Sequence, residues 1–348
     1  MLSQRLKAAK VAAGGGGGGG QFIAVAHYTS PYVSAYPWSG SGFGAKFANP
    51  ATLPTGDGFS VAFSPSGDAI AVAFLASPYV SAYPWSGSGF GTKFANPATL
   101  PTSLGLGVTF SPSGDAIAVA HDGSPYVSAY PWSGSGFGTK FTNPGTLPPI
   151  TGYDVDFTAA GDAIAVVGLA APYVSAYPWS GSGFGTKFAD PATIPTGYGL
   201  GVTFSPSGDA IAVAHDISPY VSAYPWSGSG FGAKFANPTT LPTGTSFNVA
   251  FSPAGDAIAV AHYNSPYISA YPWSGSGFGT KFANPATLPR FGGRDVAFSP
   301  AGDAIVLAHS GSPYVSAYPW SGSGFGTKFA NPATPPTNIG IGVAFTEI

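Results

Sequence analysis

The sequence predicts an all-β fold built from seven repeated units, and three observations support this prediction. A nearly constant segment, PYVSAYPWSGSGFGTKFANP in the copy at 78–97, occurs seven times in the 348 residues, and the tryptophans of successive copies are 47 residues apart. Within each copy, β-prone segments are separated by turns rich in glycine and proline. The first copy lacks one segment, which reappears at 343–348. With four antiparallel strands per copy, this fixed period predicts a seven-bladed β-propeller.

The second copy shows the four expected strands in order. Residues 60–64 (SVAFS) alternate in polarity and are expected to form the innermost strand, which ends at the turn 65–67. Residues 69–73 (AIAVA) are apolar throughout, as expected for a strand covered on both faces. Residues 79–83 (YVSAY) alternate again. A short outermost strand is expected at 93–95, with its lysine on the exposed edge, where it discourages pairing between molecules.

The two ends of the chain predict how the ring closes. Gly20–Gln21 lies one period before Gly67–Asp68, so the first copy begins at its second strand. Val343–Ile348 (VAFTEI) lies six periods after Val61–Ser66 and repeats the missing inner strand. The C-terminal strand 343–348 is therefore expected to complete the first blade, which leaves no open blade edge.

The unit VAFSPSGDAIAVAH, followed by PYVSAYPW, resembles the repeats of WD40-like and YVTN-type β-propellers, whose blades carry a V-x-F-S-P-x-G turn and a third strand that ends in tryptophan. The resemblance covers 21–348 and implies the propeller fold. Two features depart from the WD40 pattern: no Gly-His dipeptide precedes the inner strand, and serine follows each tryptophan. The long, regular repeat is also similar to the tachylectin-2 type of propeller lectin, which has five blades. Such folds host scaffolds, lectins and enzymes.

Composition argues against several classes of function. Charged residues make up 7% and the net charge is −2, so the chain lacks the basic surface that a nucleic-acid binder requires. The absence of cysteine excludes disulfides, thiolate nucleophiles and cysteine-ligated zinc. Apolar runs such as 69–76 fall short of the ~18 residues of a membrane-spanning helix, so no membrane insertion is expected. The basic, glycine-rich residues 1–20 are expected to form a flexible extension to the propeller at 21–348. They lack the apolar core of a secretory signal, which favours a cytoplasmic or virion-associated location.

Histidines and aspartates recur at fixed places in the repeat. Five copies have a histidine at the end of the second strand, where the other two have Phe74 and Gly168. Equivalent positions on successive blades are spread around a ring, so no metal site is predicted. We expect rim histidines that bond a neighbouring loop, with a share in a ligand-binding rim as the alternative. Six copies carry an aspartate after the SPSG-type turn, such as Asp68, which is expected to stabilise the turn through backbone N–H groups.

Variation among the copies concentrates in two short links, one after the second strand and one before the inner strand. In an up-and-down blade both links emerge on one face, here called the variable face, and the nearly invariant SPSGD and SGSGFG turns emerge on the other. Two interpretations stay open, a binding surface carried by loops or drift between duplicated units. The residues of the predicted binding surface are His27, Tyr28, Asp57, Phe74, Leu104, His121, Asp122, Tyr153, Asp154, Tyr198, His215, Asp216, Phe247, His262, Tyr263, Arg290, Arg294 and His309.

The function expected from these features is a non-enzymatic recognition or assembly scaffold. It would bind a protein partner through the variable face, with a virion or cell-surface component as one setting. The alternative is a multivalent lectin that binds glycans in repeated pockets between blades. An enzyme ranks third, because Asp154, Asp156, Arg290, Arg294 and Asp295 break the symmetry without forming a recognisable catalytic constellation. No cofactor is expected, and the oligomeric state stays open.

Overall fold

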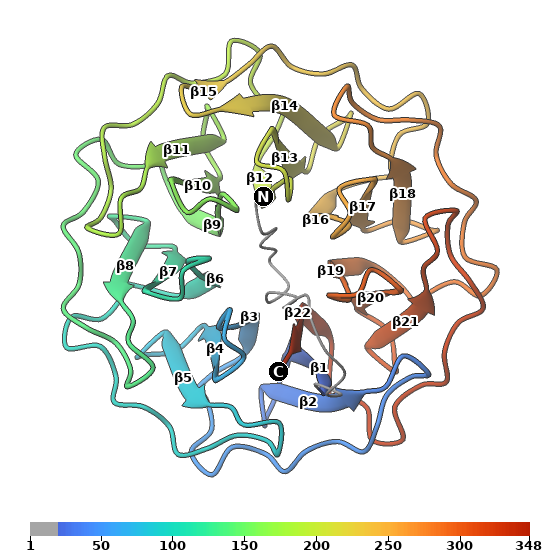
Figure 1. Cartoon of the computed structure of the whole chain (residues 1–348), viewed down its shortest axis with the longest axis horizontal. Coiled ribbons are helices and arrows are strands. Elements are labelled where there is room, and N and C mark those ends of the chain that lie inside the picture. The colour runs from blue at the N-terminus through green and yellow to red at the C-terminus, as the bar shows by residue number, and fades with distance from the viewer. Residues whose placement is uncertain (1–19) are drawn as a thin grey trace, which may run out of the picture.

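The computed structural model describes residues 20–348, in which seven antiparallel sheets stand around a central channel (Figure 1). The predicted all-β, seven-bladed propeller is confirmed. The extension predicted at 1–20 lies, except for Gly20, outside the described residues. The described part of the chain forms no helix, and so it contains no helix able to cross a membrane.

Each blade has an inner strand beside the channel, a middle strand and an outer strand (Figure 1). From blade 1 to blade 7 the inner strands are β22 (Gly340–Glu347), β3 (Gly58–Phe63), β6 (Gly105–Phe110), β9 (Gly152–Phe157), β12 (Gly199–Phe204), β16 (Ser246–Phe251) and β19 (Gly293–Phe298). The middle strands are β1 (Gln21–His27), β4 (Ala69–Phe74), β7 (Ala116–His121), β10 (Ala163–Gly168), β13 (Ala210–His215), β17 (Ala257–His262) and β20 (Ala304–His309). The outer strands are β2 (Val33–Trp38), β5 (Val80–Pro84), β8 (Val127–Pro131), β11 (Val174–Pro178), β14 (Val221–Ser227), β18 (Ile268–Pro272) and β21 (Val315–Pro319).

Blade 1 is assembled from the two ends of the described chain. β22 pairs antiparallel with β1 from Gln21↔Glu347 to His27↔Gly340, and β1 also pairs with β2. Figure 1 shows β22, in red, beside the blue strands β1 and β2. The predicted closure of the ring by the C-terminal strand is therefore confirmed.

The outermost strand is shorter than predicted. In blade 5 a fourth strand, β15 (Gly230–Phe231), pairs with β14, whereas in the other six blades a single bridge such as Trp85↔Phe90 stands in its place. The predicted strand at 93–95 is not formed, and the Phe94 N–H bonds the Ala82 oxygen at 2.9 Å. The preceding turn contains glycines with positive φ, which direct the chain out of a continuous ladder.

Aromatic side chains fasten neighbouring blades to each other. Trp85 of blade 2 packs edge-on against Phe47, from the segment that leaves blade 1, with 5.3 Å between ring centroids. Tyr83 is fully buried, and its hydroxyl donates to the Thr52 oxygen of the same segment at 2.9 Å. Edge-to-face pairs contribute ~0.5–1.5 kcal/mol beyond their buried area. The aromatic side chains that recur in every repeat therefore hold neighbouring blades at a fixed spacing.

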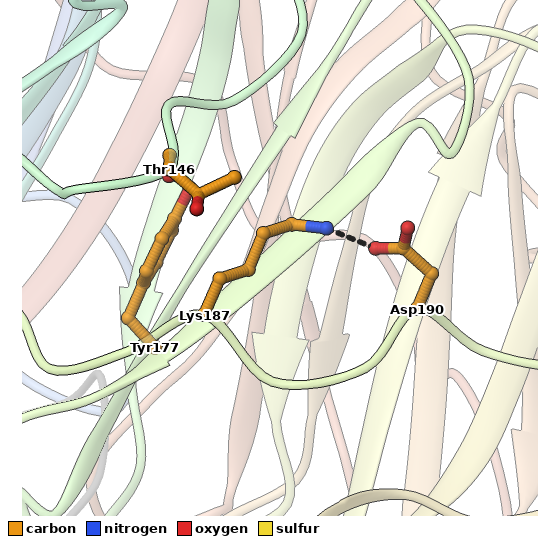
Figure 2. A network of polar contacts seen from close by, with 4 residues as sticks. All are labelled: Thr146, Tyr177, Lys187 and Asp190. Atoms are coloured by element: carbon orange, nitrogen blue, oxygen red, sulfur yellow. Dashed lines mark hydrogen bonds and ion pairs between the residues drawn. The ribbon is translucent and has the colours of Figure 1, made fainter.

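The perimeter carries one lysine per blade, and each lysine contacts the side chain three positions later. In blade 4 this contact is an ion pair between Lys187 and Asp190, and in the other blades an asparagine takes the aspartate's place. Figure 2 shows the ion pair near Tyr177, whose hydroxyl donates to the Thr146 oxygen at 2.9 Å. The Asp190 side chain is 44% exposed, so solvent screens the pair and its contribution to stability is small.

The aspartate after the SPSG-type turn stabilises that turn, through a serine hydroxyl. The Ser64 Oγ donates to the Asp68 Oδ1 at 2.7 Å and accepts the Ala69 N–H at 2.9 Å. The carboxylate thus orients the hydroxyl that bonds the backbone, in place of the direct carboxylate-to-backbone bond that the sequence predicted. These turns form the face opposite the variable face.

Candidate functional site at the channel mouth

The five histidines predicted for the variable face lie inside the blades: His27, His121, His215, His262 and His309 are each 0% exposed. Each Nε2 lies 2.9–3.0 Å from a serine Oγ on the adjacent outer strand. Burial lowers the pKa of His27, and lowers that of the other four to about 4. Phe74, at the equivalent position of blade 2, is also 0% exposed. As expected, the histidines bond neighbouring loops: the His215 Nδ1 lies 2.7 Å from the Ile217 oxygen and the His262 Nδ1 lies 2.9 Å from the Asn264 oxygen. The burial of these six side chains does not fit the binding surface in which they were also placed, because the middle strand includes them and carries them into the sheet.

The loop aspartates of the predicted surface tie neighbouring segments together. The Asp122 Oδ1 accepts the Thr151 hydroxyl at 2.6 Å, and the Asp216 Oδ1 accepts the Tyr198 N–H at 2.7 Å. The Asp57 Oδ1 accepts the Thr29 N–H at 3.3 Å. The loops that surround the channel mouth on the variable face, here called the outer rim, also carry the predicted residues Leu104, Tyr198, Tyr263 and Arg290. These four residues do not line the channel mouth among the described residues.

Seven side chains at the start of the inner strands surround the channel mouth, and we call them the mouth ring. Each belongs to the extra residue of a β-bulge: in blade 2, Gly58 pairs with Phe74 and Ser60 pairs with Ala73, which leaves Phe59 between them. A bulge re-aims the extra side chain out of the regular pleat, here toward the mouth. The mouth ring consists of Phe59, Leu106, Tyr153, Leu200, Phe247, Arg294 and Ile341.

The mouth ring and Tyr28 line a pocket of about 70 Å³. The pocket brings together five residues of the predicted surface, namely Tyr28, Tyr153, Asp154, Phe247 and Arg294. Sequence reasoning missed its other residues, Phe59, Ser60, Leu106, Leu200, Asn248 and Ile341, and did not assign Asp295 to the surface. The signal was present, because the mouth ring occupies a single column of the 47-residue repeat.

Arg294 is the cationic member of the mouth ring, and its neighbours hold it in place. Its guanidinium carbon lies 4.4 Å from the centroid of the Phe247 ring and 5.9 Å from that of Tyr263. Its Nε donates to the Ser310 Oγ at 3.0 Å. Phe247 and Ser310 thus hold the guanidinium in place, and its two terminal nitrogens, Nη1 and Nη2, are in a position to bind an anion.

Two tyrosines share the space in front of Arg294. Burial raises the pKa of Tyr153, the nearby Tyr28 raises it further, and the charge of Arg294 opposes the shift. Burial also raises the pKa of Tyr28, and Arg294 again opposes the shift. Both phenols are therefore neutral hydroxyl groups at pH 7 and can donate hydrogen bonds to a ligand in the pocket.

A second ring lies one residue further along the inner strands, and we call it the neck ring. Its members are Ser60, Gly107, Asp154, Gly201, Asn248, Asp295 and Gly342. Four of them line both the mouth pocket and a deeper channel cavity of about 120 Å³, namely Ser60, Asp154, Asn248 and Asp295. The neck ring therefore separates the two cavities.

Side chains of the neck ring cap backbone groups of the next blade. The Asp154 Oδ2 accepts the Val202 N–H at 3.0 Å, and the Asp295 Oδ2 accepts the Val343 N–H at 2.7 Å. In the deeper cavity the Asp156 Oδ2 accepts the Phe204 N–H at 3.0 Å. Inner strands are sheet edges, and such caps satisfy donors that no further strand pairs.

The arrangement offers a cation and a carboxylate on opposite walls of one small pocket. Arg294 stands on blade 7 and Asp154 on blade 4, and aromatic and aliphatic side chains lie between them. Within residues 20–348, no cluster of three histidine, aspartate or glutamate side chains is placed to hold a metal ion. Arg294 can bind an anionic ligand, and Asp154 can move a proton to or from it.

No protein-family model and no curated protein sequence matches the chain. Solved structures do match it. A putative 6-phosphogluconolactonase from Bacteroides fragilis superposes with a TM-score of 0.71 at 14% identity, over 94% of this chain and 98% of that one. The periplasmic gluconolactonase of Pseudomonas aeruginosa gives 0.68 at 15% identity, over 93% and 99%. A functionally unknown protein from Desulfotomaculum acetoxidans gives 0.67 at 13% identity, over 93% and 98%. At these identities the likeness shows a shared propeller fold.

The neighbours contradict two expectations drawn from the sequence. A non-enzymatic scaffold that binds a protein partner, and a chain that is not an enzyme, conflict with similar structures described as lactonases. The alternative of a glycan-binding lectin gains no support from them. Asp154, Arg294 and Asp295 were recognised in the sequence as breaking the symmetry, but the sequence does not show that all three line one pocket at the channel mouth.

Proposed function

We propose that the chain is a hydrolase that opens a small, anionic sugar lactone in the mouth pocket. The observation that carries the proposal is Arg294, the one cationic side chain among the described residues that line the two cavities. A fixed guanidinium binds a carboxylate or phosphate through two parallel N–H bonds. Sugar lactones of the kind named for the structural neighbours, 6-phosphogluconolactone and gluconolactone, are the first substrates to test.

The pocket supports recognition of a ring-shaped ligand. Tyr28 and Phe59 lie 5.8 Å apart, centroid to centroid, and present an aromatic wall, and Tyr153 lines the same pocket. Apolar walls with a small number of polar groups are typical of ligand pockets, in which the polar groups set orientation. The anion of the substrate binds Arg294, and the lactone ring extends toward Asp154.

Asp154 is the general base of the proposed reaction. A water molecule forms a bond from its oxygen to the acyl carbon while the Asp154 carboxylate takes its proton. The bond between the acyl carbon and the ring oxygen then breaks, and the ring oxygen takes the proton from Asp154. The product is the open hydroxy acid, and the carboxylate is regenerated. Asp295 has a different part, because its two oxygens accept the Val296 and Val343 N–H groups at 2.8 Å and 2.7 Å.

The finer resemblance is part of the same proposal. The V-x-F-S-P-x-G turn and the third strand ending in tryptophan support placing the chain among the WD40-like and YVTN-type propellers. The absent Gly-His dipeptide and the serine after each tryptophan favour the YVTN type over the WD40 repeats.

The test is hydrolysis of 6-phosphogluconolactone and of glucono-δ-lactone, measured against the uncatalysed rate at mildly acidic pH. The variant Arg294→Gln is expected to raise KM for the phosphorylated lactone by roughly 10- to 100-fold, the worth of a hydrogen bond to a charged group. Arg290→Gln is the matched control, because Arg290 is an exposed arginine four residues away on the outer rim. Purified protein that hydrolyses neither lactone above the uncatalysed rate would refute the proposal.

A further inference from the structure

The neck ring follows a pairing rule. Ser60, Asp154 and Asp295 each stand one blade before a glycine, and each accepts an N–H from the residue that follows that glycine, namely Val108 at 3.3 Å, Val202 at 3.0 Å and Val343 at 2.7 Å. The glycines are Gly107, Gly201 and Gly342. A polar side chain on one blade and a glycine on the next thus form one capped unit.

Glycine is also needed for close approach between blades. A Cβ added at Gly107 would lie 2.9 Å from the Asp154 Cα, one added at Gly201 would lie 2.7 Å from the Asn248 Cα, and one added at Gly342 would lie 2.9 Å from the Ser60 Cα. These are backbone atoms of the following blade and cannot move aside cheaply. The neck ring therefore alternates between polar residues and glycines as far as the number of blades allows.

Seven blades cannot be divided into pairs, and the unpaired member is Asn248. The next blade carries Asp295 instead of a glycine, and the Val296 N–H that Asn248 would cap is already bonded to the Asp295 Oδ1 at 2.8 Å. Within residues 20–348 no protein group forms a hydrogen bond with the Asn248 side chain. Its amide is partly exposed and lines both cavities. Asn248 is the polar neck residue without a capping task.

Asn248 lies where the proposed reaction needs a donor. Asn248 follows Phe247, which stacks on Arg294, and all three residues line the mouth pocket. It belongs to blade 6, which is separated from Asp154 on blade 4 by blade 5 alone. Hydrolysis of a lactone places negative charge on the carbonyl oxygen, and a fixed N–H donor there stabilises the transition state. A carboxylate at this position would repel that charge.

We propose that Asn248 is a catalytic residue whose side-chain N–H donates to the carbonyl oxygen of the lactone as that oxygen becomes an anion. This inference rests on the proposed lactone hydrolysis. Because the amide caps no backbone group, its position is explained by the ligand and not by the stability of the ring. The assignment divides the neck ring into Asp154 as the base, Asn248 as the donor, and Asp295 and Ser60 as structural caps.

The test compares Asn248→Ala and Asn248→Asp with the wild-type chain in steady-state lactone hydrolysis and in thermal unfolding. Asn248→Ala is expected to lower kcat by about 100-fold, the typical effect of removing one such donor, with little change in KM. Asn248→Asp has the same shape, loses the donor when ionised, and is expected to lose at least as much activity. Neither variant is expected to shift the melting temperature by more than a surface substitution does. Asn143→Ala, at the outer perimeter beside Lys140, is the control that keeps full activity.

The outcomes separate this inference from the proposed function. If the wild-type chain hydrolyses lactones and Asn248→Ala keeps kcat within about threefold of it, the role of Asn248 is refuted and the proposed function stands. If the wild-type chain hydrolyses none, the proposed function fails, and calorimetric titration with 6-phosphogluconate decides the binding role. Binding that weakens about tenfold in Asn248→Ala, the worth of one good hydrogen bond, supports an Asn248 donor. Equal binding, or no binding by either protein, overturns it.

Discussion

The outer strands and the channel mouth obey opposite rules, although both come from the same repeat. The outer strands keep the word VSAYPW with one change, Ile268, and the tryptophans repeat their contacts, with 5.2 Å between Trp85 and Phe90 and 5.3 Å between Trp320 and Phe325. At the mouth ring the same column holds Phe, Leu, Tyr, Arg and Ile. Packing between identical blades has one best solution, which can be used seven times. Binding of one asymmetric ligand on the channel axis requires that the blades differ.

The largest expected effect lies in the repeated part. Trp132→Ala removes a side chain that is 5% exposed and packs against Phe94 and Phe137. It is expected to lower the free energy of unfolding by ~3–5 kcal/mol, because the site cannot collapse onto the cavity. Chemical denaturation measures the loss. Activity per folded molecule is expected to stay unchanged. A decrease of the free energy of unfolding by less than about 1 kcal/mol would show that the tryptophans do not hold the blades together.

The next effect separates two carboxylates of the neck ring. Asp154→Asn keeps an oxygen that accepts the Val202 N–H and removes the proposed base, so kcat is expected to fall by about 100-fold while the melting temperature stays close to that of the wild-type chain. Asp295→Ala is expected to do the reverse and lower stability, because the Val296 and Val343 N–H groups lose their acceptor. Steady-state kinetics and thermal unfolding of both proteins test this division. Equal losses of activity would show that the two carboxylates act together.

A smaller effect concerns the buried histidines and pH. Burial lowers the pKa of His121 to about 4, from an ordinary value of 6.5, so between these values the unfolded chain binds a proton that the folded chain does not. The neutral form of His121 therefore makes its full contribution to the free energy of unfolding above pH 6.5. This contribution is lost as the pH falls toward 4, by ~1.4 kcal/mol for each unit by which the folded and unfolded pKa values differ. His121→Phe copies Phe74 of blade 2 and is expected to reduce this loss by one histidine's share. Unfolding midpoints at a series of pH values measure it, and an unchanged slope would contradict the burial of His121.

The smallest effect is expected at the perimeter. Asp190→Asn converts the ion pair of Lys187 into the lysine and asparagine contact of the other six blades. The expected change in unfolding free energy is below ~1 kcal/mol, because the aspartate is 44% exposed and screened by solvent. Thermal unfolding at low and high salt measures the difference. A larger, salt-dependent loss would mean that the perimeter also helps to hold the blades together.

Repetition explains which parts of this structure the sequence could predict. The period, the inner and middle strands and the closure by 343–348 follow from patterns that occur many times. The structure contains each of them, although the ends of the inner and middle strands differ from the predicted bounds, as in β3 (Gly58–Phe63) and β4 (Ala69–Phe74). The prediction of a strand at 93–95 was wrong, because alternating polarity over three residues is weak evidence for strand pairing. The glycines with positive φ that precede these residues direct the chain away from the sheet. Local pattern therefore fixed the elements that are long and packed on both sides.

The candidate site was only partly predictable, for a geometric reason. Tyr153 and Arg294 were predicted as loop residues, yet a β-bulge aims them at the channel. The contact between Arg294 and Phe247 joins neighbouring blades, 47 residues apart in the chain, and no local pattern shows it. Asp154 caps a backbone N–H of the next blade, whereas the N–H that Asn248 would cap is already bonded to Asp295. This difference depends on contacts between blades and is visible only in the assembled ring.

Closure through blade 1 also determines how the molecule bears mechanical load. β1 and β22 are antiparallel, and Gln21 lies opposite Glu347 at one end of their ladder. A pull on these two residues would open the pair one hydrogen bond at a time, as a zipper opens, because the bonds lie perpendicular to the strands and meet the force in sequence. A pull on Gln21 and Gly340, at opposite ends of the ladder, would load all of them together. The pairing of β1 with β22 is therefore expected to be weak when Gln21 and Glu347 are pulled apart, and strong when Gln21 and Gly340 are pulled apart.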